Sequence, residues 1–416
     1  MPEQHVVMQS ISWRDFCPWL ILFRTFRLAV SVQLLSLATA AVLLTPVGWW
    51  LCGQLLFDVD VDSGNFKNAA GDNDAGQIIN ELASWPSAQA GSIPPYSPPS
   101  PEEGNDFYQA VFRVVSHGPV LGVWQRLNLP FRHLLVEQEQ TLSRFTYFLI
   151  GGLWTMLVWS FFGGALTRSA ALQLSAEERP SFREVLHHAT SKLGSYFAAP
   201  FLPMLLVTAM ALLVMFSTGL LSRWDTSLWL AGLLWGPSLL IVMIAMIVLL
   251  GLYLGWPLMW GAISTEGTDA FDAISRSYSY TFQRPLHYLF YIVITVILGA
   301  LGWYFVYYFA EGTIAFCFWI ISCVAGLDRV ELLRGDGPVN SLDSWWLLVG
   351  SKTISFWIKL VRAVALAFTF SFFWSSLSAI YLLLRRDVDH TELDEIYLQV
   401  QEEQDDFPSF ETAASK

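Results

Sequence analysis

The chain has 416 residues, of which 54% are hydrophobic and only 14% charged, and its formal net charge is −12. Soluble domains carry about 25% charged residues, so the composition excludes an ordinary soluble protein, and the acidic balance argues against a nucleic-acid binder. The apolar residues are clustered in runs of about 20 or more, the length at which a helix crosses a hydrocarbon core about 30 Å thick. The sequence therefore predicts an all-α integral membrane protein.

Six apolar runs are interpreted as transmembrane helices. They cover residues 28–56, 145–167, 197–222, 228–256, 286–310 and 363–384. The first run also has features of a signal peptide, because Ala38-Thr39-Ala40 has the pattern of a cleavage site. Its apolar character continues to Leu56, which is too long for the apolar region of a signal peptide. We therefore expect an uncleaved first span.

The segments outside the spans differ in composition. They divide into an amphipathic N-terminus (1–27), a long external loop (57–143), a four-span domain (144–310), external or interfacial segments (311–362) and an acidic tail (385–416).

Prolines shape the expectation for the external loop. Its stretch IPPYSPPSPEEG, at 93–104, is typical of an extended linker. Pro119 and Pro130 interrupt the apolar part that follows, and this favours short helices lying on the membrane. The later run 313–327 would be about 22 Å long as a helix, so we expect it not to cross the membrane.

Basic residues in the short flanks predict the orientation. If six spans alternate, one side of the membrane receives Arg14, Arg24, Arg27, Arg168, Arg179, Arg183, Lys192, Arg276, Arg284, Arg385 and Arg386. We therefore expect a protein of the cytoplasmic (inner) membrane with both termini in the cytoplasm. Membrane lipids are the expected partners, together with other membrane or cytoplasmic proteins that the acidic tail would bind.

The polar stretches after spans two and four share one pattern of apolar residues. The second stretch reads FDAISRSYSYTFQRPLHY, at 271–288, and in both the spacing defines one stripe along an α-helix. The stripe residues are Phe182, Val185, Ala189 and Leu193 in the first stretch and Phe271, Ile274, Tyr278 and Phe282 in the second. We predict that each stretch is an amphipathic helix at the cytoplasmic interface, called an elbow below, with its stripe in the lipid.

Capping residues support both elbows. Ser181 with Glu184 has the pattern of a capping box, and Thr268 and Asp269 are suited to the N-cap position. Asp272 and Arg276 are one helical turn apart and are expected to form an ion pair on the water-facing side. Spans two and three with their elbow, and spans four and five with theirs, would then be two copies of one unit.

Few residues indicate a site. The sequence has no recognisable catalytic, cofactor-binding or metal-binding motif, and spans two to five contain no Asp, Glu, Lys or Arg between their flanks. That absence argues against transport coupled to protons or ions. The candidates for contact with lipid headgroups are Arg276, Arg284 and Lys192, although anchoring at the cytoplasmic side explains Arg276 and Arg284 more simply. Gly251 and Gly255 form a GxxxG motif, which is typical of close helix packing.

Several polar residues near span ends are interpreted as interfacial. His187 and His188 are expected at headgroup level, and Lys359 and Arg362 at the outer interface with their side chains extended toward water.

Three passages resemble one protein family. They are FFGGALTRSAALQLSAEERPSF (161–182), GWPLMWGAISTEGTDAFDAISRSYSYTFQRPLHYLFY (255–291) and AIYLLLRRDVDHTELDEIYL (379–398). Their order and wording resemble a family of uncharacterised multi-pass membrane proteins of planctomycete bacteria, over roughly residues 107–400. The resemblance implies a fold and a compartment but no activity, and it assigns no functional residue.

Two classes of function stay open. We favour a non-enzymatic component that organises a membrane complex or the cell envelope through its tail and its external loop. The alternative is a permease component for a lipid or other apolar molecule, which would not need ionisable groups in its spans. A polar cavity between the two units would favour transport, and a filled core would favour the organising role.

Overall fold

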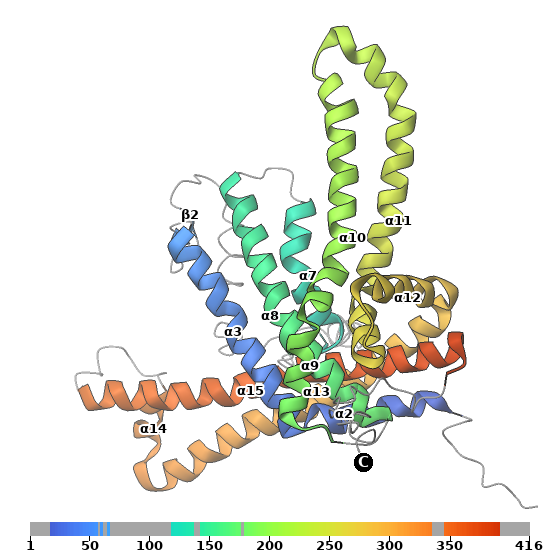
Figure 1. Cartoon of the computed structure of the whole chain (residues 1–416). Helices are drawn as coiled ribbons and strands as arrows, with labels where there is room; N and C mark the ends of the chain where they lie inside the picture. The colour runs from blue at the N-terminus through green and yellow to red at the C-terminus, as the bar shows by residue number, and fades with distance from the viewer. Residues whose placement is uncertain are drawn as a thin grey trace, which may run out of the picture.

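The structure is a computed structural model, and it describes residues 17–56, 59–60, 65–66, 118–136, 142–175, 179–334 and 345–391. Six helices in this part of the chain are long and apolar enough to cross a membrane. Their spanning regions are Val32–Gly53, Phe145–Ser175, Leu193–Gly219, Asp225–Glu266, Pro285–Ala325 and Trp345–Asp389. The prediction of an all-α membrane protein with six spans is confirmed (Figure 1).

The described residues form helices and two short strands. In order they are η1 (Pro18–Leu20), α2 (Ile21–Ala29), α3 (Val32–Leu56), β1 (Val59–Asp60), β2 (Asn65–Phe66), α7 (Leu121–Val136), α8 (Leu142–Ser175), α9 (Phe182–Ser191), α10 (Leu193–Val214), η2 (Met215–Gly219), η3 (Asp225–Ser227), α11 (Leu228–Glu266), α12 (Ala270–Gln283), α13 (Pro285–Ala325), α14 (Leu327–Arg334) and α15 (Trp345–Asp389). The two short strands pair antiparallel, with Val59 opposite Phe66.

The C-terminal half of α15 forms the centre of the fold. Nearly every side chain from residue 363 to residue 384 is buried, because α2, α3, α8, α11, α12 and α13 all pack against this helix. Figure 1 shows it crossing the lower ends of α3 and α8. Serine hydroxyls join it to two of these neighbours: Ser371 donates to the Ala29 carbonyl at 2.9 Å, and Ser378 to the Thr167 carbonyl at 3.2 Å. A helix that is apolar all round is stable only when covered in this way.

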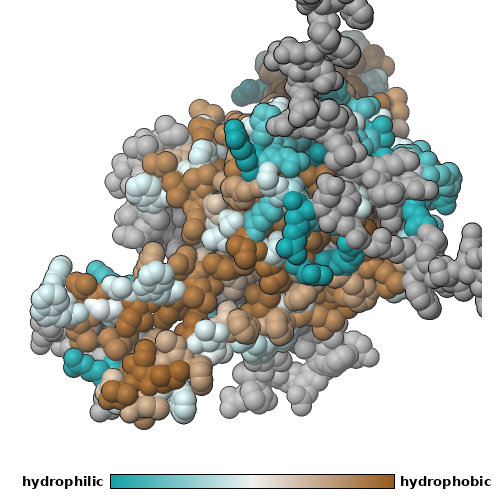
Figure 2. All heavy atoms as spheres, turned by 60° about the horizontal axis from the view of Figure 1, so that its bottom comes forward, coloured by the Kyte–Doolittle hydropathy of each residue, from teal (hydrophilic) through white to brown (hydrophobic). Residues whose placement is uncertain are grey.

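Two long apolar hairpins extend from this body. One consists of α10 and α11, and the other of α13 and the N-terminal half of α15 (Figure 1). Large apolar side chains lie exposed along both, such as Trp229 and Leu233 on the first and Phe309 on the second. Figure 2 shows the apolar surface over the second hairpin in brown. In a bilayer such side chains face lipid, which is as apolar as they are.

The second hairpin includes residues 311–334 and 345–362, which were predicted to be external or interfacial segments. The helix α13 continues through the run 313–327, which was expected not to cross, and α15 already begins at Trp345. An ion pair joins the two helices of the hairpin, since Arg362 of α15 donates from Nε and Nη2 to the carboxylate of Glu311 of α13, at 2.7 and 2.9 Å. The charge at Arg362 is therefore satisfied within the hairpin, and its predicted position extended toward water is wrong.

The helix α7 corrects a second prediction. Pro119 precedes it and Pro130 lies within it, so Pro130 does not break the segment into short pieces. The helix packs along α8 and buries Val123 and Leu127 there. Gly152 of α8 lies beside Pro130, and a Cβ atom there would be in ordinary van der Waals contact with the proline side chain. Packing of an apolar face thus outweighs the hydrogen bond that the proline removes.

The orientation of the chain can be tested with reporter fusions. Alkaline phosphatase fused after Asp74 is expected to be active, because that position is predicted to lie outside the cytoplasm, where the enzyme can fold with its disulfides. The same enzyme fused after Lys416 is expected to be inactive. An inactive fusion at Asp74 together with an active fusion at Lys416 would reverse the predicted topology.

Candidate functional site

Both elbows are helices with side-chain caps at their first turn. In α9 the Ser181 hydroxyl accepts a hydrogen bond from the Glu184 amide at 3.2 Å, as the capping box predicts. In α12 the cap is Asp269, whose carboxylate accepts from the Asp272 amide at 2.9 Å. Each elbow therefore begins at the residue that its capping pattern indicates.

The two faces of α12 have different surroundings. The stripe residues at its ends stay outside the protein, with Phe271 71% and Phe282 47% exposed. Its buried face is made of smaller or polar residues, including Ala273 and Ser277, and it packs against α11. The two ends of the stripe are thus available to lipid, whereas its middle residues, Ile274 and Tyr278, pack against the protein, so the prediction that the whole stripe lies in lipid is wrong.

Gly251 and Gly255 lie where α12 packs against α11. A Cβ atom at Gly251 would collide with the ring of Tyr278, and one at Gly255 would lie 2.6 Å from the Ser277 hydroxyl oxygen. The Tyr278 hydroxyl also donates to the Val248 carbonyl at 2.6 Å. The second elbow, α12, therefore packs against α11 at the GxxxG motif.

A charged cluster joins α11, α12 and α15 at the end of α11. Glu266 is its centre: its carboxylate lies 2.7 Å from Arg276 and 3.4 Å from Arg385, and it accepts a hydrogen bond from Tyr381 at 2.6 Å. Arg276 also lies 3.8 Å from Asp389. The predicted pair with Asp272 is therefore wrong, because Arg276 points to α11 and α15 instead.

Tyr280 extends this cluster on the α12 side. Its hydroxyl donates to the Asp389 carboxylate. Burial, and then this hydrogen bond to a carboxylate, raise the pKa of Tyr280 above its ordinary value. The phenol therefore stays protonated at neutral pH and serves as a donor that holds the end of α15 to the elbow.

The other polar candidates are divided between protein contacts and the surface. Lys192 donates to the Gly267 carbonyl at 2.6 Å, at the end of α11 where carbonyls lack helical partners, whereas Arg284 is exposed. Arg168 is buried and donates to the Ser264 carbonyl at 2.7 Å. His188 is also buried, with Nε2 3.3 Å from the Tyr196 hydroxyl, so its predicted interfacial position is wrong, while His187 is exposed.

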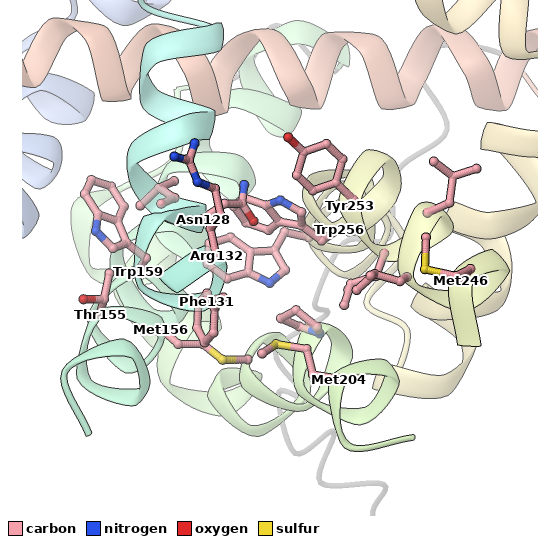
Figure 3. Close-up of a pocket in the computed structure, with 16 residues that line it drawn as sticks. Asn128, Phe131, Arg132, Thr155, Met156, Trp159, Met204, Met246, Tyr253 and Trp256 are labelled. Atoms are coloured by element: carbon pink, nitrogen blue, oxygen red, sulfur yellow. The ribbon is translucent and has the colours of Figure 1, made fainter. Parts of the chain in front are cut away.

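A cavity of about 500 Å³ lies between α7, α8, α10 and α11 (Figure 3). This volume falls within the range of about 300–1,000 Å³ that is usual for small-molecule sites. Most of its wall is apolar. The lining residues are Leu127, Asn128, Phe131, Arg132, Thr155, Met156, Trp159, Pro200, Met204, Met246, Leu249, Leu250, Leu252, Tyr253, Trp256 and Trp260.

Stacked indoles make part of this wall rigid. Trp260 stacks on Trp374 of α15 with ring centroids 4.5 Å apart, and Trp159 stacks on Phe370 at 4.6 Å. Gly163 of α8 makes room, because a Cβ atom there would collide with Trp260. The central helix α15 thus supports the cavity wall from behind.

Two polar side chains of the cavity wall come from α7. Asn128 and Arg132 are one helical turn apart and so share a face of that helix. Asn128 donates to the Trp124 carbonyl at 2.7 Å, and Figure 3 shows its side chain pointing toward Trp256. The buried indole N–H of Trp256 has no hydrogen-bond partner among the described residues. Buried polar groups are usually paired, so this donor could be satisfied by an acceptor on a ligand.

Sequence reasoning did not find the cavity. Its residues come from four helices, and α7 was expected to lie on the membrane surface. A helix predicted to continue through Pro130 would have placed Leu127 beside Phe131, and Asn128 beside Arg132, on one face.

No protein-family model matches the chain, and no match was found among curated proteins or among solved structures. The resemblance to the planctomycete membrane family therefore stays a prediction.

Proposed function

We propose that this multi-pass membrane protein binds a lipid-like apolar molecule within the bilayer, as a permease component for such molecules would. The observation that carries the proposal is the cavity of about 500 Å³ walled by α7, α8, α10 and α11. We further propose that the membrane is the cytoplasmic one and that both termini face the cytoplasm, on the basis of the basic flanks.

The chemistry of the wall supports binding over catalysis. Among the described residues that line the cavity there is no Asp, Glu, His, Lys or Cys, and the hydroxyls of Thr155 and Tyr253 therefore lack a lining base that would activate them. Three methionines, Met156, Met204 and Met246, supply flexible and polarisable contacts that adapt to different apolar shapes. The wall therefore suits an apolar ligand that is bound and released without chemical change.

A second candidate is the component that organises a membrane complex. It is favoured by the filled body around residues 363–384 and by the long apolar hairpins, whose exposed side chains include Trp319 and Trp357. The acidic tail, 385–416, is described only to residue 391. Stable co-purification of a second membrane protein, lost when the tail is removed, would support this role.

Photolabelling tests the binding proposal directly. The purified full-length protein in lipid nanodiscs is exposed to oleyl alcohol that carries a diazirine on its chain, and labelled peptides are mapped by mass spectrometry. We expect labelling of the peptides that contain Met156 and Met204, because their side chains line the cavity. Excess unlabelled oleyl alcohol should remove this labelling and leave that of lipid-facing peptides unchanged.

A matched pair of variants locates the binding. Met204→Trp fills the cavity with a larger ring and should reduce the competed labelling about tenfold. Met215→Trp makes the same change at an exposed position of the same hairpin and should leave it unchanged. The proposal would be refuted if excess oleyl alcohol did not reduce the labelling. It would also be refuted if the Met204→Trp and Met215→Trp proteins were labelled to the same extent.

A further inference from the structure

We infer that the cavity takes one long apolar chain that carries an anionic headgroup, and that the headgroup binds Arg132. The inference rests on the proposed function and specifies the class of ligand. It excludes neutral apolar molecules as the preferred occupants.

The size and shape of the site favour a single chain. The volume of about 500 Å³ lies in the lower half of the usual range for small-molecule sites, which excludes a whole two-chain phospholipid with its headgroup. The lining continues along α11 from Met246 to Trp260, fourteen residues or about 21 Å along the helix axis. This elongated wall suits an extended hydrocarbon chain.

Arg132 is the only cation among the described residues that line the cavity. It is exposed and forms no ion pair with a described carboxylate, whereas Arg276, Arg362 and Arg385 each pair with a glutamate. A guanidinium presents donors in a planar fork that fits a carboxylate or a phosphate. The charge of Arg132 therefore complements an anionic group at the edge of the cavity.

The indole of Trp256 gives a second, independent indication of an oxygen-bearing ligand. Its N–H is buried and has no partner in the described part of the chain, and its side chain and that of Asn128 point toward one another (Figure 3). Asn128 lies one helical turn before Arg132, about 6 Å away on the same face. The polar groups of Asn128, Arg132 and Trp256 therefore lie in one part of the cavity wall (Figure 3).

Competition against the diazirine-bearing oleyl alcohol tests the inference. At alkaline pH, where the carboxylate is ionised, unlabelled oleate should compete at about five- to tenfold lower concentration than unlabelled oleyl alcohol. Arg132→Gln should remove this advantage and leave competition by oleyl alcohol unchanged, and Arg132→Lys should retain part of it. Arg284→Gln, at an exposed arginine outside the cavity, is the matched control and should have no effect.

A further arm distinguishes the two sources of such a chain. Dioleoylphosphatidylglycerol that competes as well as oleate would identify the ligand as one chain of an anionic phospholipid, and competition by oleate alone would identify a free carboxylate. Both results support the shared chemistry. Equal competition by oleate and oleyl alcohol, or an oleate advantage that survives Arg132→Gln, overturns the inference. These two outcomes would not contradict the proposed function, because labelling by the neutral oleyl alcohol probe would still show that the cavity binds an apolar molecule. Only a lack of labelling that oleyl alcohol competes would contradict both the proposed function and the inference.

Discussion

The change Glu266→Gln is expected to lower the free energy of unfolding by about 3 kcal/mol, because it removes the carboxylate that two arginines share. The Glu266 side chain is 10% exposed and that of Arg385 is 12% exposed, so the change removes this ion pair at a site with little access to water. We take the low end of the usual range because the second arginine, Arg276, is 37% exposed and keeps water contacts. Thermal unfolding of the detergent-purified protein would measure the loss.

The matched control is Asp272→Asn. This carboxylate lies one turn from Arg276 in sequence but is exposed, and only the backbone amide of Asp272 takes part in the N-cap. The change should alter the free energy of unfolding by less than about 0.5 kcal/mol. If Asp272→Asn were the more damaging of the two, the cluster around Glu266 would not be what holds α12 to α11 and α15.

The change Gly251→Leu is expected to lower the free energy of unfolding by about 2–3 kcal/mol. Any side chain at this position meets the ring of Tyr278, which lies directly against the glycine. The elbow must then move away from α11 and lose the hydrogen bond from Tyr278 to the Val248 carbonyl. Thermal unfolding again measures the effect, and increased proteolysis within α12 would locate it.

Gly236 provides the control on the same helix. No atom lies within 4 Å of a Cβ built there, so Gly236→Leu meets open space. It should be neutral or stabilising, since leucine exceeds glycine in helix propensity by close to 1 kcal/mol. Adding Tyr278→Ala to Gly251→Leu should recover part of the stability. A Gly251→Leu protein as stable as the Gly236→Leu protein would show that α12 does not pack on α11 through this glycine.

Features that depend on neighbours in sequence were predicted well. Six apolar runs give six spans, and the caps at Ser181 and Asp269 begin α9 and α12, because both features arise from residues within one or two helical turns. The exposure of Phe271 and Phe282 agrees with the predicted stripe of the second elbow, but the stripe of the first elbow is buried in the protein at Val185 and Ala189, so its prediction was wrong there.

Features that depend on distant partners could not be derived in the same way. Arg276 has a carboxylate four residues earlier, at Asp272, yet it pairs with Glu266, which the turn at Gly267 brings close. Arg362 was expected to extend toward water. Its partner, Glu311, lies 51 residues earlier, so the sequence near Arg362 does not show the ion pair. The cavity needs α7 to pack along α8, and hydropathy alone does not decide whether an amphipathic segment with a proline lies on lipid or on protein.

The burial of α15 has a consequence for the order in which the protein is made. Synthesis proceeds from the N-terminus, so α3, α8 and α11 leave the ribosome before residues 363–384, against which all three pack. Until that helix arrives, the small and hydroxyl-bearing faces of the earlier helices have no partner, and the indole of Trp260 lacks Trp374 to stack on. Assembly of the body must therefore wait for α15, and nascent chains that stop short of it would be substrates for membrane quality control.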